Sequence, residues 1–266
     1  MYLKRKIDEF LVQWKNNKDR LPLIVKGARQ IGKTESINHF AKKYYSNIVY
    51  INFVLEPKYK TILSDGYDAD SIVKNITLLD TKKKFIKDDT LLIFDEIQEY
   101  PDIATSLKSF KVDGKYDVIC SGSLLGIHYQ KIHSNSVGYK TDYEMYSMDF
   151  EEFLWAMGDE VTTSFIRECF EKKMPLGQGA HRKVMNSFRQ YLLVGGMPQS
   201  VLAYMNGKDF EASDTAKRNI LRLYRDDVAK FADGYEDKVF AVFDGIPGQL
   251  SKKEKKYKLS SLDKNA

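Results

Sequence analysis

The sequence predicts an α/β protein whose core has three layers, with helices on both faces of a parallel sheet, followed by a wholly helical region. Short apolar runs alternate with amphipathic segments over the first part of the chain, as in strand–helix–strand units. Beyond about residue 158 the apolar spacing is helical only. With 266 residues, of which 43% are hydrophobic and 13% aromatic, the chain can form one large domain or two small ones.

The first apolar run, residues 23–25, leads into a glycine-rich loop. Residues 27–34 read G-A-R-Q-I-G-K-T and match G-x-x-x-x-G-K-[ST], the phosphate-binding P-loop or Walker A pattern. The glycines let successive backbone N–H groups surround a phosphate, and the helix that begins near Lys33 directs its positive dipole end there. Lys33 supplies a charge for the β- and γ-phosphates, and the Thr34 hydroxyl can ligate Mg²⁺.

A chance match to this pattern occurs in about one chain in a hundred of this length. The apolar run before the loop and the amphipathic run after it favour a working P-loop. We therefore predict that the chain binds a nucleoside triphosphate, and that Arg29 and Gln30 contribute at least their backbone N–H groups. The residues predicted to contact the nucleotide here are Gly27, Ala28, Arg29, Gln30, Ile31, Gly32, Lys33, Thr34 and Glu35.

A second apolar run, residues 91–94, ends in Asp95 and Glu96 and has the Walker B form. A buried strand of this kind carries its carboxylates to the carboxyl edge of a parallel sheet, where ligands bind in open α/β folds. Asp95 can hold the Mg²⁺ shell, and Glu96 can orient or deprotonate a water that attacks the γ-phosphate. The alternative, a strand that ends in two solvated acids, is less favoured because the run follows a P-loop.

A third buried strand, residues 116–120, ends in Ser121-Gly122-Ser123. A small polar side chain at the tip of the strand beside Asp95 is placed to sense a γ-phosphate, although strand tips also carry Ser and Gly for turn reasons alone. The sequence does not decide between the two serines. We take Ser121 as a nucleotide contact, and the catalytic candidates are Lys33, Asp95, Glu96 and Ser123.

The remaining elements follow from local spacing. Residues 3–16 place their apolar side chains on one face, which predicts a helix packed against the core. We divide the chain into a nucleotide-binding core at 1–158, a helical lid at 159–235, and a linker or the start of a truncated winged-helix domain at 236–266. Further strands are expected at 47–53 and 143–148, and helices or helical fragments at 59–63, 72–79, 101–110, 149–157, 161–172, 181–194, 197–204 and about 213–232.

Composition makes several classes of protein unlikely candidates. Cys120, Cys169 and the four histidines show no metal-ligand spacing, so neither zinc nor a disulfide scaffold is expected. No apolar run approaches the ~20 residues that cross a membrane, and no signal core is present, so we expect a cytoplasmic protein without a membrane partner. The net charge of +5 and the lysine-rich tail from residue 249 make DNA a weak candidate partner.

Several segments together resemble a known family: Y-L-K-R-K at 2–6, G-A-R-Q-I-G-K-T at 27–34, F-D-E-I-Q at 94–98, S-G-S-L-L-G at 121–126, D-F-E-E-F-L at 149–154 and G-G-M-P at 195–198. They resemble the bacterial and archaeal AAA-type ATPases of the AAA+ superfamily whose P-loop reads G-A-R-Q-x-G-K-T. The resemblance implies a P-loop NTPase core with a helical lid, which binds ATP and ADP with Mg²⁺ and hydrolyses ATP. It also implies a C-terminal domain of unknown function, association into rings or dimers, and an inferred link to DNA.

Two features depart from the family pattern. Members often carry Gly-Arg after the sensor strand, a candidate trans-acting arginine, where this chain has Gly138-Tyr139-Lys140. Members are usually much longer, so the chain resembles the N-terminal ATPase module of a truncated protein. Likeness to related signalling ATPases implies that Met197 and Pro198 line the base pocket, and a simple helix break is the alternative. Other candidate γ-phosphate or interface arginines are Arg182, Arg189 and Arg225.

The first functional hypothesis is an ATPase in which Asp95 holds the metal and Glu96 acts on the water. The alternative is a nucleotide-gated switch or scaffold with negligible turnover, which the missing Gly-Arg favours. A P-loop kinase is disfavoured, because a water-activating glutamate serves hydrolysis. The client, the oligomeric state and any arginine finger are not specified by the sequence.

Overall fold

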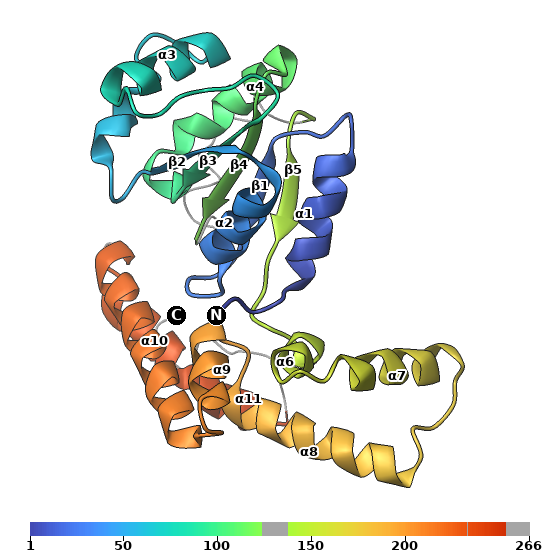
Figure 1. Ribbon diagram of the computed structural model, residues 1–266. Helices are drawn as coiled ribbons and strands as arrows, with labels where there is room; N and C mark the ends of the chain where they lie inside the picture. Colours follow the sequence, from blue (N-terminus) through green and yellow to red (C-terminus); the bar gives the residue numbers. More distant parts are fainter. Residues whose placement is uncertain (124–137, 233, 254–266) are drawn as a thin grey trace.

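The computed structural model describes residues 1–123, 138–232 and 234–253, and contains a sheet core and a group of helices beside it (Figure 1). In chain order the elements are α1 (Lys6–Asn16), β1 (Leu23–Lys26), α2 (Lys33–Tyr44), β2 (Asn47–Asn52), η1 (Pro57–Thr61), α3 (Ala69–Leu79), β3 (Thr90–Asp95), η2 (Ile97–Glu99), η3 (Pro101–Ser106), α4 (Leu107–Asp113), β4 (Asp117–Gly122), β5 (Thr141–Glu144), α6 (Phe150–Ala156), α7 (Glu160–Glu171), α8 (Gln178–Val194), α9 (Pro198–Met205), α10 (Phe210–Phe231) and α11 (Glu236–Ser251).

The five strands form one sheet in the order β2-β3-β4-β1-β5, and every pair is parallel. The order places β4 between β1 and β3, although β4 comes after both in the chain. Because parallel strands all point the same way, the carboxyl ends of β1, β4 and β3 meet at one edge. The P-loop follows β1 at this edge, and Asp95 ends β3 there.

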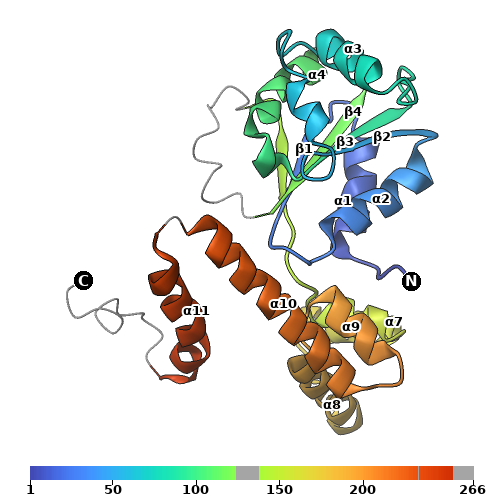
Figure 2. The same ribbon diagram turned by 90° about the vertical axis from the view of Figure 1, so that its left-hand side faces the viewer.

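Alternating side chains of the buried strands face two separate helical layers. In β3, Leu91 and Ile93 pack with α1 and α2, whereas Leu92 and Phe94 pack with α3 and α4. This follows from the two-residue period of a strand, since both faces of the sheet are covered. The predicted three-layer α/β/α core with a parallel sheet is confirmed (Figures 1 and 2).

Helices α6 to α10 pack together beside the carboxyl edge of the sheet. Helices α6, α8 and α9 share a cluster that includes Phe153, Val194, Val201 and Tyr204, and Leu3 from the N-terminus also packs in it. Figure 2 shows α10 running from α8 and α9 toward the core, with α11 following it. The helical region expected after the core is therefore present. The domain boundaries themselves stay a prediction, and the helix α6 on the core side of residue 158 packs with the lid.

The first helix begins at Lys6, not at Leu3 as expected from its apolar spacing. The residues before it are not helical, because their side chains have partners elsewhere. Leu3 is buried in the lid cluster, the Tyr2 ring stacks on His39 at 3.8 Å, and Arg5 has extended backbone angles. The apolar pattern fitted a longer helix, but tertiary contacts determine where the helix starts.

The predicted strand at 143–148 is also displaced, since β5 ends at Glu144. The register pairs Glu144 with Lys26, the last residue of its partner β1, so the pairing of β5 ends where β1 ends. Met148 has already left the sheet, and its N–H donates to the carbonyl of Gly196 in the lid at 2.7 Å.

One further expectation needs correction. The helix expected at 101–110 is divided into the 3₁₀ turn η3 and the short helix α4. The segment from residue 236, expected as a linker or the start of a winged-helix domain, begins with the helix α11, and that assignment stays a prediction. The helices expected at 161–172, 181–194, 197–204 and 213–232 are confirmed as α7 to α10 within a few residues. Of the helices described, none has the length and apolar character that crossing a bilayer requires.

Candidate nucleotide-binding site

The loop between β1 and α2 depends on glycine at both ends. Gly27 has φ +149°, and a Cβ built there would lie 2.2 Å from the backbone oxygen of Met145. Gly32 precedes α2 in the left-handed region at φ +92°. Any other residue would therefore strain the backbone at both positions and collide with the main chain at Gly27.

Lys33 is buried beneath the loop. Its Nζ donates to the carbonyl oxygens of Gly27 at 2.9 Å and Ala28 at 2.7 Å. Burial lowers the pKa of the Lys33 ammonium, although the carboxylates of Glu96 and Asp95 act in the opposite direction. The ammonium is thus held by two loop carbonyls, which an incoming phosphate would have to replace as partner.

One oxygen of the Asp95 carboxylate accepts hydrogen bonds from three side chains, one on α2 and two on β2. Its Oδ2 accepts from Thr34 Oγ1 at 3.0 Å, from the Tyr50 hydroxyl at 2.6 Å and from Asn52 Nδ2 at 3.3 Å. Burial and the bond to Asp95 raise the pKa of Tyr50, so the phenol stays a donor. Neither Tyr50 nor Asn52 was predicted. The available signal was the polar end of the strand at 47–53, since the register sets Asn52 opposite Asp95.

The two serines at the tip of β4 have different partners. Ser121 is fully buried and donates to Asp95 Oδ1, which also accepts the Glu96 N–H at 3.0 Å. Ser123 Oγ lies 3.4 Å from Glu96 Oε2 and 3.3 Å from Arg29 Nε. Ser121 therefore positions the predicted metal-binding carboxylate, whereas Ser123 lies among the groups that face the cleft.

Glu96 follows β3 in the left-handed region, with φ 57° and ψ 46°. This conformation is costly for a residue other than glycine and turns the chain sharply away from the strand. The carboxylate accepts from the Gln98 side-chain amide, and Gln98 Oε1 in turn accepts the N–H of Ser123 at 3.2 Å. Gln98 thus links the end of β3 to the end of β4 and occupies part of the Glu96 carboxylate.

These groups surround a cleft of about 770 Å³ between the P-loop, the ends of β2 to β4 and helix α9. This is within the usual size range of small-molecule sites. Nine predicted residues line it, namely Arg29, Gln30, Gly32, Lys33, Thr34, Glu35, Glu96, Ser123 and Pro198. Met1, Asn52, Val54, Leu55, Gln199 and Leu202 line it too, and were not predicted. Gly27, Ala28, Ile31, Asp95 and Ser121 are not among the lining residues.

The Gly-Gly-Met-Pro turn joins the lid to this cleft. A Cβ at Gly196 would lie 2.1 Å from the backbone oxygen of Met148, so only glycine lets these two segments of the backbone pack this closely. Pro198 starts α9 and lines the cleft, and Gln199 Nε2 donates to Gln30 Oε1 at 2.7 Å. The turn therefore acts as a helix break and also brings α9 to the cleft. Met197 packs instead with the α1–α2 side of the core.

The candidate arginines Arg182, Arg189 and Arg225 are absent from the described lining of the cleft. Arg225 pairs with Asp244 of α11, and Arg189 donates to Asn186 at 3.0 Å. Lys140, at the place of the family's Gly-Arg, lies 2.9 Å from Asp142.

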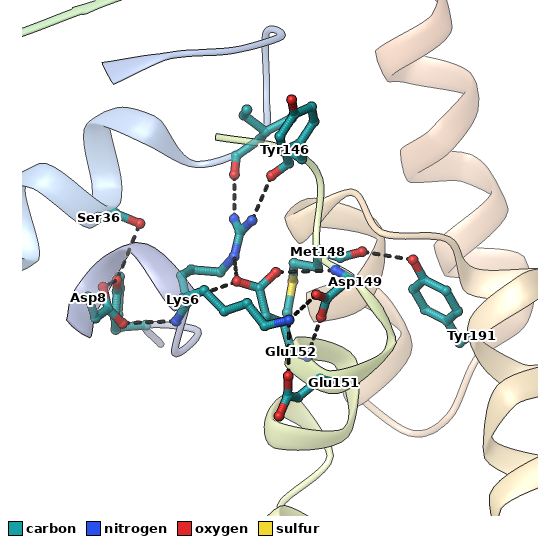
Figure 3. A network of polar contacts seen from close by, with 12 residues as sticks. Lys6, Asp8, Ser36, Tyr146, Met148, Asp149, Glu151, Glu152 and Tyr191 are labelled. Atoms are coloured by element: carbon teal, nitrogen blue, oxygen red, sulfur yellow. Dashed lines mark hydrogen bonds and ion pairs between the residues drawn. The ribbon is translucent and has the colours of Figure 1, made fainter. Parts of the chain in front are cut away.

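A buried arginine connects the P-loop to the start of the lid. Arg5 Nη1 donates to the Ile31 carbonyl at 2.6 Å and Nη2 to the Tyr146 carbonyl at 2.7 Å. Its Nε lies 3.1 Å from Glu152 Oε1, and both side chains are 5% exposed. Figure 3 shows the surrounding network, in which Glu152 also accepts from the backbone of Lys6 at 2.7 Å. Sequence reasoning missed Arg5, whose basic neighbours gave no sign that it is buried.

Thr34 at the start of α2 and Asp95 at the end of β3 have oxygen atoms that suit a Mg²⁺ ion. In an octahedral shell with ligands at about 2.1 Å, adjacent ligand oxygens are about 3.0 Å apart. Thr34 Oγ1 and Asp95 Oδ2 have this separation, 3.0 Å. Mg²⁺ usually completes its shell with phosphate oxygens and water, and the cleft that Thr34 lines has room for both.

The P-loop after β1, the acidic end of β3 and the strand order together define a nucleotide-binding domain of the P-loop ATPase class. Residues 19–154 match the family described as AAA domain. Because the match covers more than half of the chain, the protein belongs to that family. Residues 185–266 match a domain of unknown function (DUF8612). The expected AAA-type module with such a C-terminal domain is confirmed.

Solved structures resemble the chain only distantly. C. elegans PCH-2 shares 12% identity over 81% of this chain and 68% of its own, with a TM-score of 0.44. The Aeropyrum pernix ORC2 protein in its ADP form shares 16% identity over 81% and 68%, with a TM-score of 0.39. Drosophila ORC bound to DNA shares 13% over 80% and 66%, with a TM-score of 0.42. No curated protein matches the chain in sequence.

Proposed function

We propose that the protein binds ATP with Mg²⁺ in the cleft beside the P-loop and hydrolyses it to ADP and phosphate. The observation that carries this proposal is the position of Glu96, which lines the same cleft as Lys33 and Thr34. A carboxylate at that place can act on a water beside a phosphate that the P-loop holds.

Each residue has a distinct part in this proposal. Lys33 and the backbone N–H groups of the loop bind the phosphates, and Thr34 with Asp95 holds the Mg²⁺, which neutralises phosphate charge. Glu96 orients a water and accepts its proton as the water oxygen bonds to the γ-phosphorus. The bond from that phosphorus to the bridging oxygen breaks, so ADP leaves with the electron pair. Ser123 can donate to a γ-phosphate oxygen.

A nucleotide-gated switch with negligible turnover is the second candidate. The contacts of Glu96 favour it, because its carboxylate is already bonded to Gln98 and lies near Ser123. A carboxylate oxygen that holds the Gln98 amide is not available to an incoming water. On this proposal ATP binding would change the lid while hydrolysis stays slow until Gln98 releases Glu96.

The deciding experiment measures phosphate release with Mg·ATP over a range of protein concentrations, alongside nucleotide binding. Hydrolysis predicts turnover that Glu96→Gln removes while binding persists, and that Glu99→Gln retains. Glu99 is a matched control because it lies on η2 and pairs with Lys60 at 3.3 Å, outside the described cleft lining. Tight binding without turnover in the parent protein would select the switch. Binding that survives Lys33→Ala would contradict both.

Oligomers and DNA belong to the same set of measurements. Turnover per chain that rises with protein concentration would support the proposal that a neighbouring copy completes the site.

DNA association is a weaker proposal, supported by the lysine-rich stretch from Lys252 onward, most of which lies outside the described residues. If duplex binding is absent even at low salt, that proposal fails.

A further inference from the structure

The side chain of Arg29 joins the P-loop to the lid helix α10. Its Nη1 lies 2.6 Å from Asp227 Oδ1, and its Nε lies 3.3 Å from Ser123 Oγ. The Tyr224 hydroxyl, one turn before Asp227, donates to the Arg29 carbonyl at 3.0 Å. The last turns of α10 thus contact both the backbone and the side chain of one P-loop residue.

Asp227 is an unusually placed carboxylate. Its side chain is 10% exposed, and its buried Oδ2 has no hydrogen-bond partner among the residues that the structure describes. A buried carboxylate oxygen without a donor is costly, so the charge of Arg29 is a main reason that Asp227 is tolerated there. The ion pair therefore helps to hold α10 against the loop, beside the bond from Tyr224 to the Arg29 carbonyl.

Arg29 also belongs to the cationic side of the cleft. It lines the cleft with Lys33, and its charge contributes to lowering the pKa of the Lys33 ammonium. Ser123, its second contact, lies 3.4 Å from the Glu96 carboxylate. A guanidinium presents a planar fork of donors that matches a phosphate, and a terminal phosphate beside Ser123 would offer it a doubly charged partner.

We propose that Arg29 exchanges partners, pairing with Asp227 when no γ-phosphate is present and binding the γ-phosphate when it is. The inference rests on the proposed binding of ATP in this cleft, and it assigns the Arg29 side chain a specific part in distinguishing ATP from ADP. A second consequence is that ATP releases the end of α10, since Asp227 loses its counter-charge and becomes more stable in water.

The packing of α10 allows its two ends to behave differently. Its first turns are anchored in the lid, where Ser213 Oγ lies 2.8 Å from Ser200 Oγ and the Phe210 ring lies 4.9 Å from Tyr204. Its last turns carry Tyr224 and Asp227 toward the P-loop, and α11 follows them (Figure 2). A change at Arg29 would therefore displace the α10–α11 connection while the anchored half stays in place.

The test compares affinities for ADP and for an ATP analogue with an imido bridge between the β- and γ-phosphates, both with Mg²⁺, by calorimetry. We expect Arg29→Gln to lower the affinity for the analogue by about 10- to 100-fold and the affinity for ADP by less than about threefold. Asp227→Asn removes the competing partner, so it should raise the preference for the analogue by about 3- to 10-fold. In the Arg29→Gln background, Asp227→Asn should leave that preference unchanged.

Controls separate this inference from the proposed function. Arg218→Gln removes an exposed arginine of α10 that pairs with Asp214 at 2.7 Å, and should leave both affinities unchanged. Arg29→Gln could lower the affinities for ADP and the analogue equally, or Asp227→Asn could lower the preference for the analogue. Either result would contradict the exchange of partners but not the proposed binding of ATP. If Lys33→Ala still binds both nucleotides, the ligand lies elsewhere, and the proposed function and the exchange are both wrong.

Discussion

The Thr34 hydroxyl lies 3.0 Å from the Asp95 carboxylate, although the two residues are 61 positions apart in the chain. The strand order causes this contact, because β1 and β3 flank β4 and end at the same edge of the sheet. The contact connects the P-loop helix directly to the end of β3. The other donors to Asp95 hold its carboxylate in this position, which leads to the first prediction.

Tyr50→Phe should weaken Mg²⁺ binding without abolishing nucleotide binding. The variant deletes one of the donors that orient Asp95 Oδ2, and a hydrogen bond to a charged group contributes about 1.5–3 kcal/mol. We expect roughly a tenfold increase in the Mg²⁺ concentration that supports ATP binding. A titration with Mg²⁺ at a fixed ATP concentration measures this shift. Tyr44→Phe, on the far end of α2, is the control, and an equal shift in both variants would contradict a role for the Tyr50 hydroxyl.

Gly27→Ala should lower the free energy of unfolding and remove nucleotide binding. A Cβ at Gly27 would meet the Met145 carbonyl oxygen at 2.2 Å in a backbone conformation with φ +149°. Such a collision with main chain, added to the backbone strain, should cost more than about 2 kcal/mol. Denaturant unfolding measures the change.

Gly179→Ala is the matched control for that substitution. Gly179 lies in α8, where a Cβ would meet nothing within 4 Å. Alanine is favoured over glycine in a helix, so this variant should gain about 0.5–1 kcal/mol of stability. Similar effects at both glycines would show that the crowding at Gly27 is not what constrains the loop.

The sequence was most informative where a residue's role depends on its neighbours in the chain. The P-loop, its helix and the acidic end of β3 were predicted because glycine spacing and a short apolar run determine the local backbone. The alternation of short apolar runs with amphipathic segments predicted the layers in the same way. These features need no knowledge of distant partners.

Positions that depend on distant partners were not predicted. The spacing of residues 3–16 cannot show that Leu3 packs in the lid, so the first helix was expected three residues too early. Ser121 and Ser123 look alike in sequence, yet only Ser121 donates to Asp95. Asp227 reads as one acid among many on an amphipathic helix, and its pairing with the P-loop follows from the lid's placement alone.

Breaking the buried Arg5–Glu152 pair should destabilise the protein strongly. Glu152→Gln leaves the Arg5 guanidinium buried without its counter-charge, and removal of one partner from a buried pair costs about 3–5 kcal/mol. Glu160→Gln is the control, because Glu160 pairs with Lys4 at the surface. Their side chains are 61% and 46% exposed, so this pair should contribute under about 1 kcal/mol. Chemical denaturation of both variants measures the difference. Comparable losses would mean that the buried pair gives no more stability than an exposed one.

Nucleotide binding should take up protons at alkaline pH through Lys33. Burial lowers the pKa of this ammonium in the free protein, so part of Lys33 loses its proton below the ordinary value of 10.5. Between the folded pKa and 10.5 the folded state binds fewer protons at Lys33 than the unfolded state does. The contribution of Lys33 to the free energy of unfolding therefore increases as pH rises through that window. A bound phosphate favours the ammonium and raises its pKa again. ATP binding should therefore consume a fraction of a proton in that window.

Calorimetry in buffers of different ionisation enthalpy measures the uptake. Lys43→Ala, at the opposite end of α2, should retain it, because that lysine lies outside the described lining of the cleft. The readout does not depend on hydrolysis, so it applies equally to a switch. Proton release on binding, or the same proton uptake in Lys33→Ala, would show that Lys33 is not the group whose charge the phosphate stabilises.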